Sequence, residues 1–253
     1  MKIDLDNATA LSVQIAEAIR AAIISGDMDV DSRLPSEAEL AEQFDVSRPT
    51  IREALKRLAA QSLIRTQRGA FGGAFVRRLS YEEAQKQLIT TSTLLLSMNE
   101  ISFDTACEAR FALERSCAVL AASRRSEAHL DRMAREIEVQ RAPGLSDEDF
   151  CASDVAFHSA LVASAANPVL TYQVASAIEA MQPLMNMITF TARSRAEIVA
   201  IHEALLAALE GNNADGLGSA LEDLEAYTKS LAHSVFEARR AARLKADGDQ
   251  PEA

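Results

Sequence analysis

The sequence predicts a mainly α-helical protein in two parts, three helices with a short β-hairpin followed by an all-α helical bundle. Ala and Leu dominate its 253 residues, whereas aromatic residues make up 5% and Gly and Pro number 9 and 6. This composition favours helices and leaves little material for strands. Gly69, Gly72 and Gly73 cluster in the one stretch that is typical of two short strands joined by a turn.

Two helical patterns open the chain. The first runs from about Ala8 to Ser25, with its apolar residues on one stripe and Gly26 as its stop. The second begins at Ser36, which is spaced with Glu39 as a capping box, and ends near Phe44.

A third helix and a hairpin complete the first part. Ser47 is a natural N-cap, and Pro49 lies in the first turn, where its missing N–H costs nothing. The hairpin strands are expected at Leu63–Thr66 and Ala74–Arg77. Three helices followed by a two-stranded hairpin form the plan of a winged helix-turn-helix.

Long helices follow the hairpin. We expect them at about Tyr81–Met98, Phe103–Arg124, Glu127–Arg141, Asp147–Ala165, Pro168–Phe190, Arg195–Glu210 and Ala214–Leu244. We therefore divide the chain into residues 1–78, residues 79–245, and a polar tail at residues 246–253 that we expect to be disordered.

The charge is distributed unevenly between these parts. The chain has 26 Lys and Arg against 37 Asp and Glu, a net charge of −11. Residues 1–78 hold 11 of each sign, so the acidic excess belongs to the second part. Residues 46–78 hold eight Lys or Arg against Glu53 alone. The third helix and the hairpin therefore form a basic surface suited to nucleic acid on an otherwise acidic chain.

Other classes of protein fit poorly. No apolar run approaches the roughly 20 residues that a membrane-spanning helix needs. The chain shows no secretory signal pattern, so we expect a cytoplasmic protein with no membrane partner. Cys107, Cys117 and Cys151 lie inside helical patterns and are expected to be buried, reduced thiols.

The third helix and the hairpin tip carry the residues suited to DNA. Arg48 and Arg52 are spaced i, i+4 and share a helix face that can reach base edges or phosphates. Ser47 and Thr50 suit phosphate oxygens, and Arg68 lies beside glycines that allow close approach to a minor groove. Taken singly, each residue could instead be a solvated side chain or a simple helix cap.

Residues Leu34–Leu58 closely resemble the signature of GntR-family transcriptional regulators, and the wing Gly69–Val76 also resembles theirs. The resemblance implies operator reading through the third helix and the wing. The DNA-binding residues that we expect are Ser36, Ser47, Arg48, Thr50, Arg52, Arg68 and Gly69. Ala38 stands where the family commonly has Arg, so the operator sequence should not be borrowed from relatives.

The second part offers a candidate metal or effector site. Asp154 and His158 are spaced i, i+4 on one helix, a spacing that can chelate a metal. The alternative is a plain intrahelical Asp–His pair. His202 lies on a different long helix and could meet this pair inside a bundle.

The second part also resembles the all-helical FCD effector domain of FadR-type GntR regulators, over roughly residues 80–240. The resemblance rests on Glu108-Ala109-Arg110 with Leu113-Glu114, Asp154 with Phe157-His158, Asn167–Leu170, and His202 with Ala208-Leu209. In such domains the Asp and the histidines bind a divalent metal, which implies a metal site at Asp154, His158 and His202.

The resemblance also shows a departure at the last ligand. The family's final histidine falls on Leu224, and His233 lies about half a helical turn away from that position. Asp223, Tyr227, water or the effector could fill the place. We expect Zn²⁺ or a similar divalent ion, with direct binding of an anionic effector by the two histidines as the alternative.

Arg110 resembles the family's inward-facing arginine, which implies pairing with an effector carboxylate. The alternative is a weak surface pair of Arg110 with Glu114 at i, i+4. We expect the effector to bind at Arg110, Asp154, His158 and His202, and to be a small organic acid or sugar acid.

The function that fits best is a ligand-responsive transcriptional regulator, a homodimer on a palindromic double-stranded DNA operator, and not an enzyme. One alternative is a metal-dependent hydrolase or lyase built on Asp154, His158 and His202. Another is a constitutive DNA-binding protein with no effector, which polar residues inside a helical bundle argue against.

Overall fold

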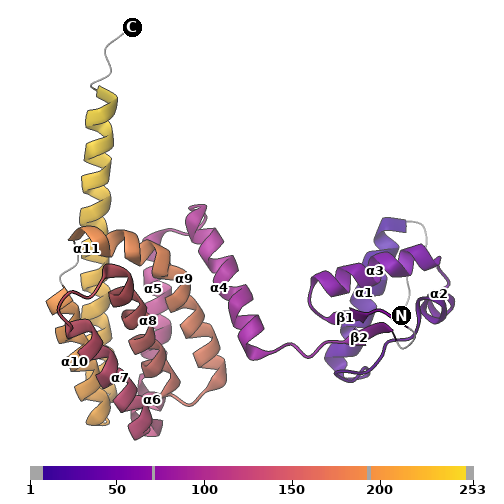
Figure 1. Cartoon of the computed structure of the whole chain (residues 1–253), viewed down its shortest axis with the longest axis horizontal. Helices are drawn as coiled ribbons and strands as arrows, with labels where there is room; N and C mark the ends of the chain where they lie inside the picture. Colours follow the sequence, from indigo (N-terminus) through magenta and orange to yellow (C-terminus); the bar gives the residue numbers. More distant parts are fainter. Residues whose placement is uncertain (1–7, 70–71, 193–194, 249–253) are drawn as a thin grey trace. The chain divides into compact units, whose positions relative to one another are not determined.

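The computed structural model describes residues 8–69, 72–192 and 195–248. The chain divides into two compact units, Met1–Glu83 and Ala84–Ala253. The described residues confirm the predicted fold class, a winged helix-turn-helix followed by an all-α bundle (Figure 1).

The first unit is built around helix α3. Its elements are α1 (Ala8–Ser25), α2 (Glu37–Phe44), α3 (Arg48–Ala60), β1 (Ile64–Gln67) and β2 (Gly73–Val76). Helices α1 and α2 pack on α3, whose face of Ile51, Ala54 and Leu58 is buried. β1 pairs with β2 in antiparallel register, with Ile64 opposite Val76, and both of these residues join the core.

A third extended segment, which the sequence analysis missed, completes the wing. Arg33 forms a β-bridge with Phe75. Leu34 N–H donates to the Ala74 carbonyl at 2.8 Å, and Val76 N–H donates to the Ser32 carbonyl at 2.9 Å. The connection between α1 and α2 therefore covers the free edge of β2.

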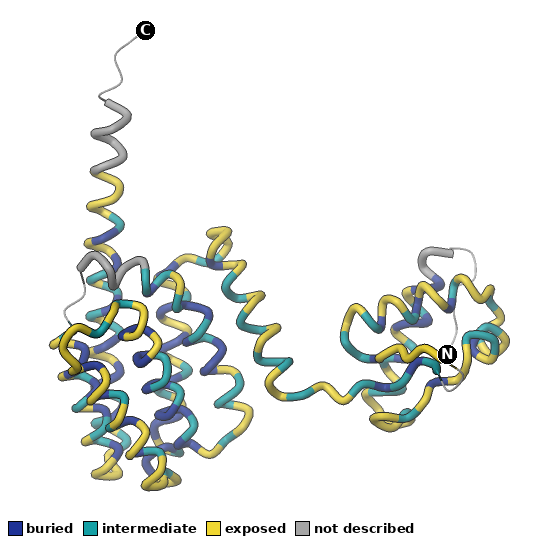
Figure 2. Tube along the Cα trace, viewed as in Figure 1, coloured by how far each residue is buried: buried dark blue, intermediate teal, exposed yellow. Residues whose placement is uncertain are grey.

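The second unit is a helical bundle. Its elements are α4 (Tyr81–Ser97, which begins in the first unit), α5 (Phe103–Ser116), α6 (Ala118–Arg124), α7 (Glu127–Arg141), α8 (Asp147–Ala163), α9 (Pro168–Ala192), α10 (Arg195–Glu210) and α11 (Ala214–Gly248). Helix α8 packs against α7 and α9, and α10 packs against α7 and α11. Helix α8 contributes the buried Phe150, Phe157, Ala160 and Leu161, so it runs through the core of the bundle (Figure 2).

The single helix expected at Phe103–Arg124 is interrupted at Cys117. The Ser116 hydroxyl donates to the Leu113 carbonyl at 2.6 Å and competes for the acceptor that Cys117 N–H would use in a regular helix. The Cys117 N–H turns instead to the Glu114 carbonyl at 3.0 Å, a tighter turn that ends α5 and begins α6.

The remaining differences are small. Helix α11 continues to Gly248, three residues into the predicted tail, and residues 249–253 lie outside the described part of the chain. Cys107, Cys117 and Cys151 are buried and free, as expected. Among the described helices, none has the length and hydropathy to cross a bilayer.

Candidate functional site

The first candidate site is the N-terminal half of α3. Ser36 and Glu39 form the predicted capping box at the start of α2, and Asp45 ends that helix in the left-handed conformation. Ser47 then caps α3, its hydroxyl accepting from Thr50 N–H at 3.4 Å and lying 2.8 Å from the Thr50 hydroxyl. Three residues therefore separate α2 from α3, and the first turn of α3 lies at the surface.

The arginines of this surface differ in their partners. Arg48 is exposed and makes no ion pair with any described residue. Arg52 is also exposed, but its Nη2 lies 3.1 Å from Glu37 Oε2, so it bridges α3 to the start of α2. Hydrogen bonding to Glu37, and then its charge, raise the pKa of Arg52. Any new anionic partner of Arg52 must therefore displace Glu37, whereas Arg48 has no such ion pair to break.

The wing supplies the second arm of this surface. Arg68 and Gly69 are exposed at its tip, and Gly69 has a φ of +110°, a conformation that L side chains rarely adopt. Residues 70–71, at the centre of the tip, lie outside the described part of the chain. Arg68 pairs with no described acid, while Arg65 lies over the Phe75 ring at 4.9 Å.

The basic stretch at residues 46–78 is thus partly neutralised. Its four acid-paired members are Arg52, Lys56, Arg77 and Arg78, bound to Glu37, Glu53, Glu83 and Asp31. Within the described residues of this stretch, Arg48, Arg57 and Arg68 have no acidic partner. The available positive charge therefore lies on α3 and the wing tip. The residues that we propose below to contact DNA are called the DNA-reading surface: the exposed Ser47, Arg48, Arg52, Arg68 and Gly69, with the half-buried Thr50.

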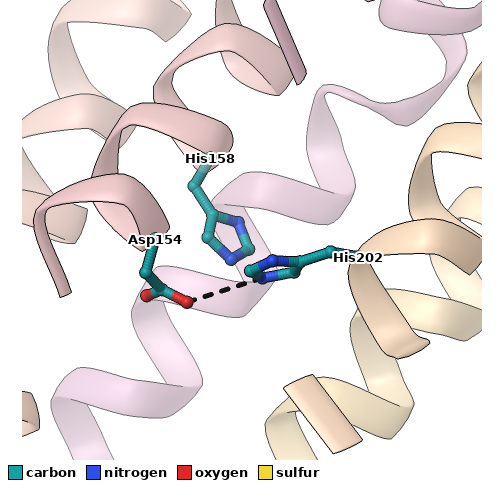
Figure 3. Close-up of side chains that lie close together, drawn as sticks. All are labelled: Asp154, His158 and His202. Atoms are coloured by element: carbon teal, nitrogen blue, oxygen red, sulfur yellow. Dashed lines mark ion pairs between the residues drawn. The ribbon is translucent and has the colours of Figure 1, made fainter. Parts of the chain in front are cut away.

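The second candidate site is buried in the bundle. Asp154 and His158 on α8 and His202 on α10 each offer one ligand atom, and these atoms lie within 4.8 Å of one another (Figure 3). His202 Nε2 is 3.5 Å from Asp154 Oδ1, and the two imidazole rings meet edge-on with centroids 5.2 Å apart. Both histidines are fully buried and Asp154 is 5% exposed. We call these three residues the buried cluster.

His158 is held by a carboxylate on α5. Its Nδ1 lies 2.7 Å from Glu114 Oε2, and Glu114 Oε1 accepts from Arg110 Nε at 2.7 Å. Burial alone would raise the pKa of Glu114, but the charges and hydrogen bonds of His158 and Arg110 outweigh it and lower the pKa to about 2. An ionised Glu114 accepts a hydrogen bond from His158 Nδ1–H, so Nε2 is the ring nitrogen left to face the cluster.

The orientation of His202 is set by an amide on α7. Its Nδ1 lies 2.7 Å from Gln140 Oε1, and its ring stacks on Phe157 with centroids 4.1 Å apart. Phe157 comes directly before His158 on α8, so this one helix supplies Asp154, His158 and the ring on which His202 stacks.

The donor set of the buried cluster fits a divalent metal ion. Two imidazole nitrogens and one carboxylate oxygen are ligands that Zn²⁺ and similar ions accept. His158 Nε2 is buried and has no hydrogen-bond partner among the described residues. Both Nδ1 atoms are occupied by oxygen acceptors, the arrangement that directs imidazole Nε2 toward a metal.

Arg110 forms the pair with Glu114 that we had considered, but not on the surface. Arg110 is 2% exposed and Glu114 is 0% exposed, because α5 packs between α9 and α11. Burial lowers the pKa of Arg110, but the negative charges of Glu114 and Asp154 raise it by more, so the pKa is raised overall. Beyond the Nε contact, its guanidinium makes no hydrogen bond or ion pair with a described residue. Its Nη donors are therefore available to an anion.

Two of the residues considered for the last metal ligand, Asp223 and His233, lie at the surface. Leu224 is 2% exposed and belongs to the bundle core, whereas Asp223 is exposed. His233 Nε2 lies 2.9 Å from Asp104 Oδ2 at the surface, away from the buried cluster. Sequence reasoning missed the roles of Glu114 and Gln140, because they precede the histidines they contact by 44 and 62 residues.

Comparisons with known proteins agree with this architecture. The model of the gntR family of bacterial regulatory proteins matches residues 11–76, and that of the FCD domain matches residues 105–226. A protein of Escherichia coli (strain K12), provisionally named L-lactate dehydrogenase operon regulatory protein, is 29% identical over 222 residues, covering 83% of this chain and 82% of that protein. The HTH-type transcriptional regulator YcbG of Bacillus subtilis (strain 168) is 28% identical over 209 residues, covering 83% of this chain and 84% of that protein.

A solved structure of Streptococcus agalactiae GntR has a similar fold, with a TM-score of 0.54 and 22% identity over 88% of this chain and 99% of that one. The names of the two relatives are those of regulators and not of enzymes. With both halves matched by family models, the chain belongs to the GntR family of bacterial transcriptional regulators and carries an FCD domain.

Proposed function

We propose that this regulator binds a palindromic operator as a homodimer and that a small carboxylate-bearing metabolite, bound at Arg110 and the buried cluster, controls its affinity for DNA. The observation that carries the proposal is the buried cluster itself. Burying two imidazoles and a carboxylate among apolar helices costs free energy, so the bundle does not need these residues for its stability. Their convergence beside a buried arginine fits a ligand site.

DNA is read by the DNA-reading surface, with Ser36 at the adjoining start of α2. The first half of α3 enters the major groove, where Arg48 and Arg52 reach base edges or phosphates. Ser47 and Thr50 bind phosphate oxygens, and Arg68 with Gly69 approaches the minor groove. Two such surfaces related by a two-fold axis match a palindromic operator.

The effector side combines a metal and an arginine. Asp154, His158 and His202 would hold a divalent ion, which supplies an attachment point for a carboxylate or hydroxyl oxygen. Arg110 donates from its Nη groups to the effector carboxylate. A relative is named for an L-lactate dehydrogenase operon, so L-lactate is the first effector to test, followed by other organic acids and by sugar acids.

The response requires that the effector prefer one arrangement of the dimer. An effector that binds the DNA-competent and incompetent arrangements equally shifts nothing, however tightly it binds. The expected coupling is a change in operator affinity of about 5- to 150-fold.

The DNA half is tested by selecting an operator from a randomised duplex library and measuring affinity by fluorescence anisotropy. Arg48→Ala should weaken operator binding by about 5- to 150-fold, the worth of one good base contact. Arg20→Ala removes the same charge from α1 and serves as the matched control, since Arg20 binds Glu17 and, at the C-terminal end of α3, Gln61, and so lies away from the N-terminal half of α3. Equal affinities for the wild type and the Arg48→Ala, Arg52→Ala double variant would refute operator reading through α3.

The effector half is tested by thermal shift with each acid, with and without Zn²⁺ or a chelator. A ligand should raise the melting temperature of the wild type and not that of His158→Ala or Arg110→Met. The same ligand should then change operator affinity. If no acid or divalent ion shifts the wild type, the effector proposal fails while the DNA proposal stands.

A further inference from the structure

Gln140 occupies a position that the family resemblance did not single out. It is 3% exposed on α7, and its carbonyl oxygen lies 2.7 Å from His202 Nδ1. Its amide nitrogen donates to the Ser153 hydroxyl on α8 at 3.2 Å. Ser153 in turn donates to Glu136 Oε2 at 2.8 Å, one turn before Gln140 on α7. These four residues form a continuous chain of hydrogen bonds from a half-buried carboxylate to the buried cluster.

The direction of every bond in this chain follows from counting protons. Glu136 has oxygens that accept, so the single Ser153 hydroxyl proton goes to it. The Ser153 oxygen then accepts, which requires the NH₂ end of Gln140 on that side. The carbonyl end of Gln140 must face His202, so His202 Nδ1 carries a proton and donates it. The Nε2 of a neutral His202 is consequently a lone pair on the side of Asp154.

We propose that Gln140, oriented by Ser153 and Glu136, is a positioning residue that fixes His202 in the tautomer and ring orientation needed to bind a transition-metal ion. The inference rests on the metal site of the proposed function. The buried cluster is then supported from two sides, by a carboxylate behind His158 and by a neutral amide behind His202. Oxygen acceptors behind metal-bound histidines hold the ring and strengthen it as a ligand.

A neighbouring contact provides the control for packing. Arg141 and Glu203 follow Gln140 and His202 directly in sequence and form an ion pair between the same two helices at the surface. If Gln140 served only to hold α7 against α10, loss of the Arg141–Glu203 pair would have a comparable effect. Gln140 also lines a groove of about 430 Å³ between these helices, so a truncated side chain would let water reach His202. A substitution of similar volume, Gln140→Met, avoids this.

The test measures the dissociation constant of Zn²⁺ for the full-length protein, stripped of metal and titrated against a competing chromophoric chelator. Gln140→Met should bind Zn²⁺ about 10- to 100-fold more weakly than the wild type. Gln140→Glu keeps an oxygen acceptor and should restore most of the affinity. Ser153→Ala frees the amide to rotate and should give a smaller loss, while Arg141→Gln should leave the affinity unchanged. Melting in excess chelator checks that each variant is folded.

The possible outcomes distinguish failure of this inference from failure of the proposed metal site on which it rests. A wild type that binds no Zn²⁺ overturns the metal site and the inference together. Wild-type affinity in Gln140→Met, or an equal loss in Arg141→Gln, overturns the inference alone. If Gln140→Met does not fold, long-range ¹H–¹⁵N NMR of the metal-free wild type decides. A proton on His202 Nδ1 supports the inference, and a proton on Nε2 alone overturns it.

Discussion

Glu114→Gln tests the ion pair beneath the buried cluster. Glu114 is fully buried on α5, where it accepts from Arg110 and contacts His158. Glutamine has nearly the same shape as a protonated glutamate, so the substitution removes the charge and little else. The difference in unfolding free energy between the two proteins therefore reports what the ionised carboxylate contributes.

The magnitude follows from the pKa of Glu114, which falls from its ordinary 4.5 to about 2 in the folded protein. Each pKa unit corresponds to about 1.4 kcal/mol, so the charged form contributes about 3 kcal/mol at pH 7. Because the folded pKa is depressed, this contribution is complete above pH 4.5 and is lost as the pH falls through about 2. At pH 3 roughly 1 kcal/mol should remain.

The assay is urea unfolding of the full chain in excess chelator, at pH 7 and at pH 3. The chain has no Trp and three Tyr, of which Tyr172 and Tyr227 lie in the second unit and Tyr81 in the first, so most of the tyrosine fluorescence follows the bundle. Glu108→Gln, an exposed glutamate on the same helix, is the matched control and should differ little from the wild type. A loss below about 1 kcal/mol at pH 7, or the same loss at both pH values, would refute the reasoning.

Three further predictions concern other parts of the chain. Ser36→Ala removes the hydroxyl that caps α2 and should destabilise the first unit by about 1 kcal/mol in urea unfolding; an unchanged midpoint would show that the capping box is dispensable. Gly73→Ala places a Cβ at a φ of +151°, 2.8 Å from Arg33 Nε, and should cost about 1 to 3 kcal/mol, measured as a lower melting temperature of the first unit. Removing bound metal with a chelator should lower the melting temperature of the bundle. If Zn²⁺ had been present at 100 times its dissociation constant, the lost stability should be about 2.7 kcal/mol. The His202→Ala variant should melt at the same temperature with and without chelator.

The sequence predicted the parts of the fold whose signals are local. Ser47 and Pro49 mark the start of α3 because capping and the missing N–H are properties of a single turn. The glycines of the wing mark the hairpin for a similar reason. The Ser32–Leu34 pairing with β2 was missed, since a three-residue extended segment has too few positions to show an alternating pattern.

The candidate metal site was predictable as a list of ligands but not as a structure. Asp154 and His158 share a helix face through their spacing, which a sequence shows directly. The residues that hold the two histidines, Glu114 at His158 and Gln140 at His202, do not show in the sequence, because they reach the histidines across helix–helix contacts that depend on how the bundle packs. For the same reason the pair of Arg110 and Glu114 was visible from its spacing, while its burial was not.

The pairing of Ser32 and Leu34 with β2 fixes how the wing is attached to the helices of the first unit. Pro35 alone separates this extended segment from Ser36, where the capping box starts the helix that leads into α3. The wing and the reading helix are therefore joined at both ends, through α3–β1 on one side and through Leu34–Ser36 on the other. Within the described residues the wing and α3 are thus held in one fixed arrangement. If they contact the minor and major grooves as proposed, an operator with one base pair inserted between the two contacts should lose one of them.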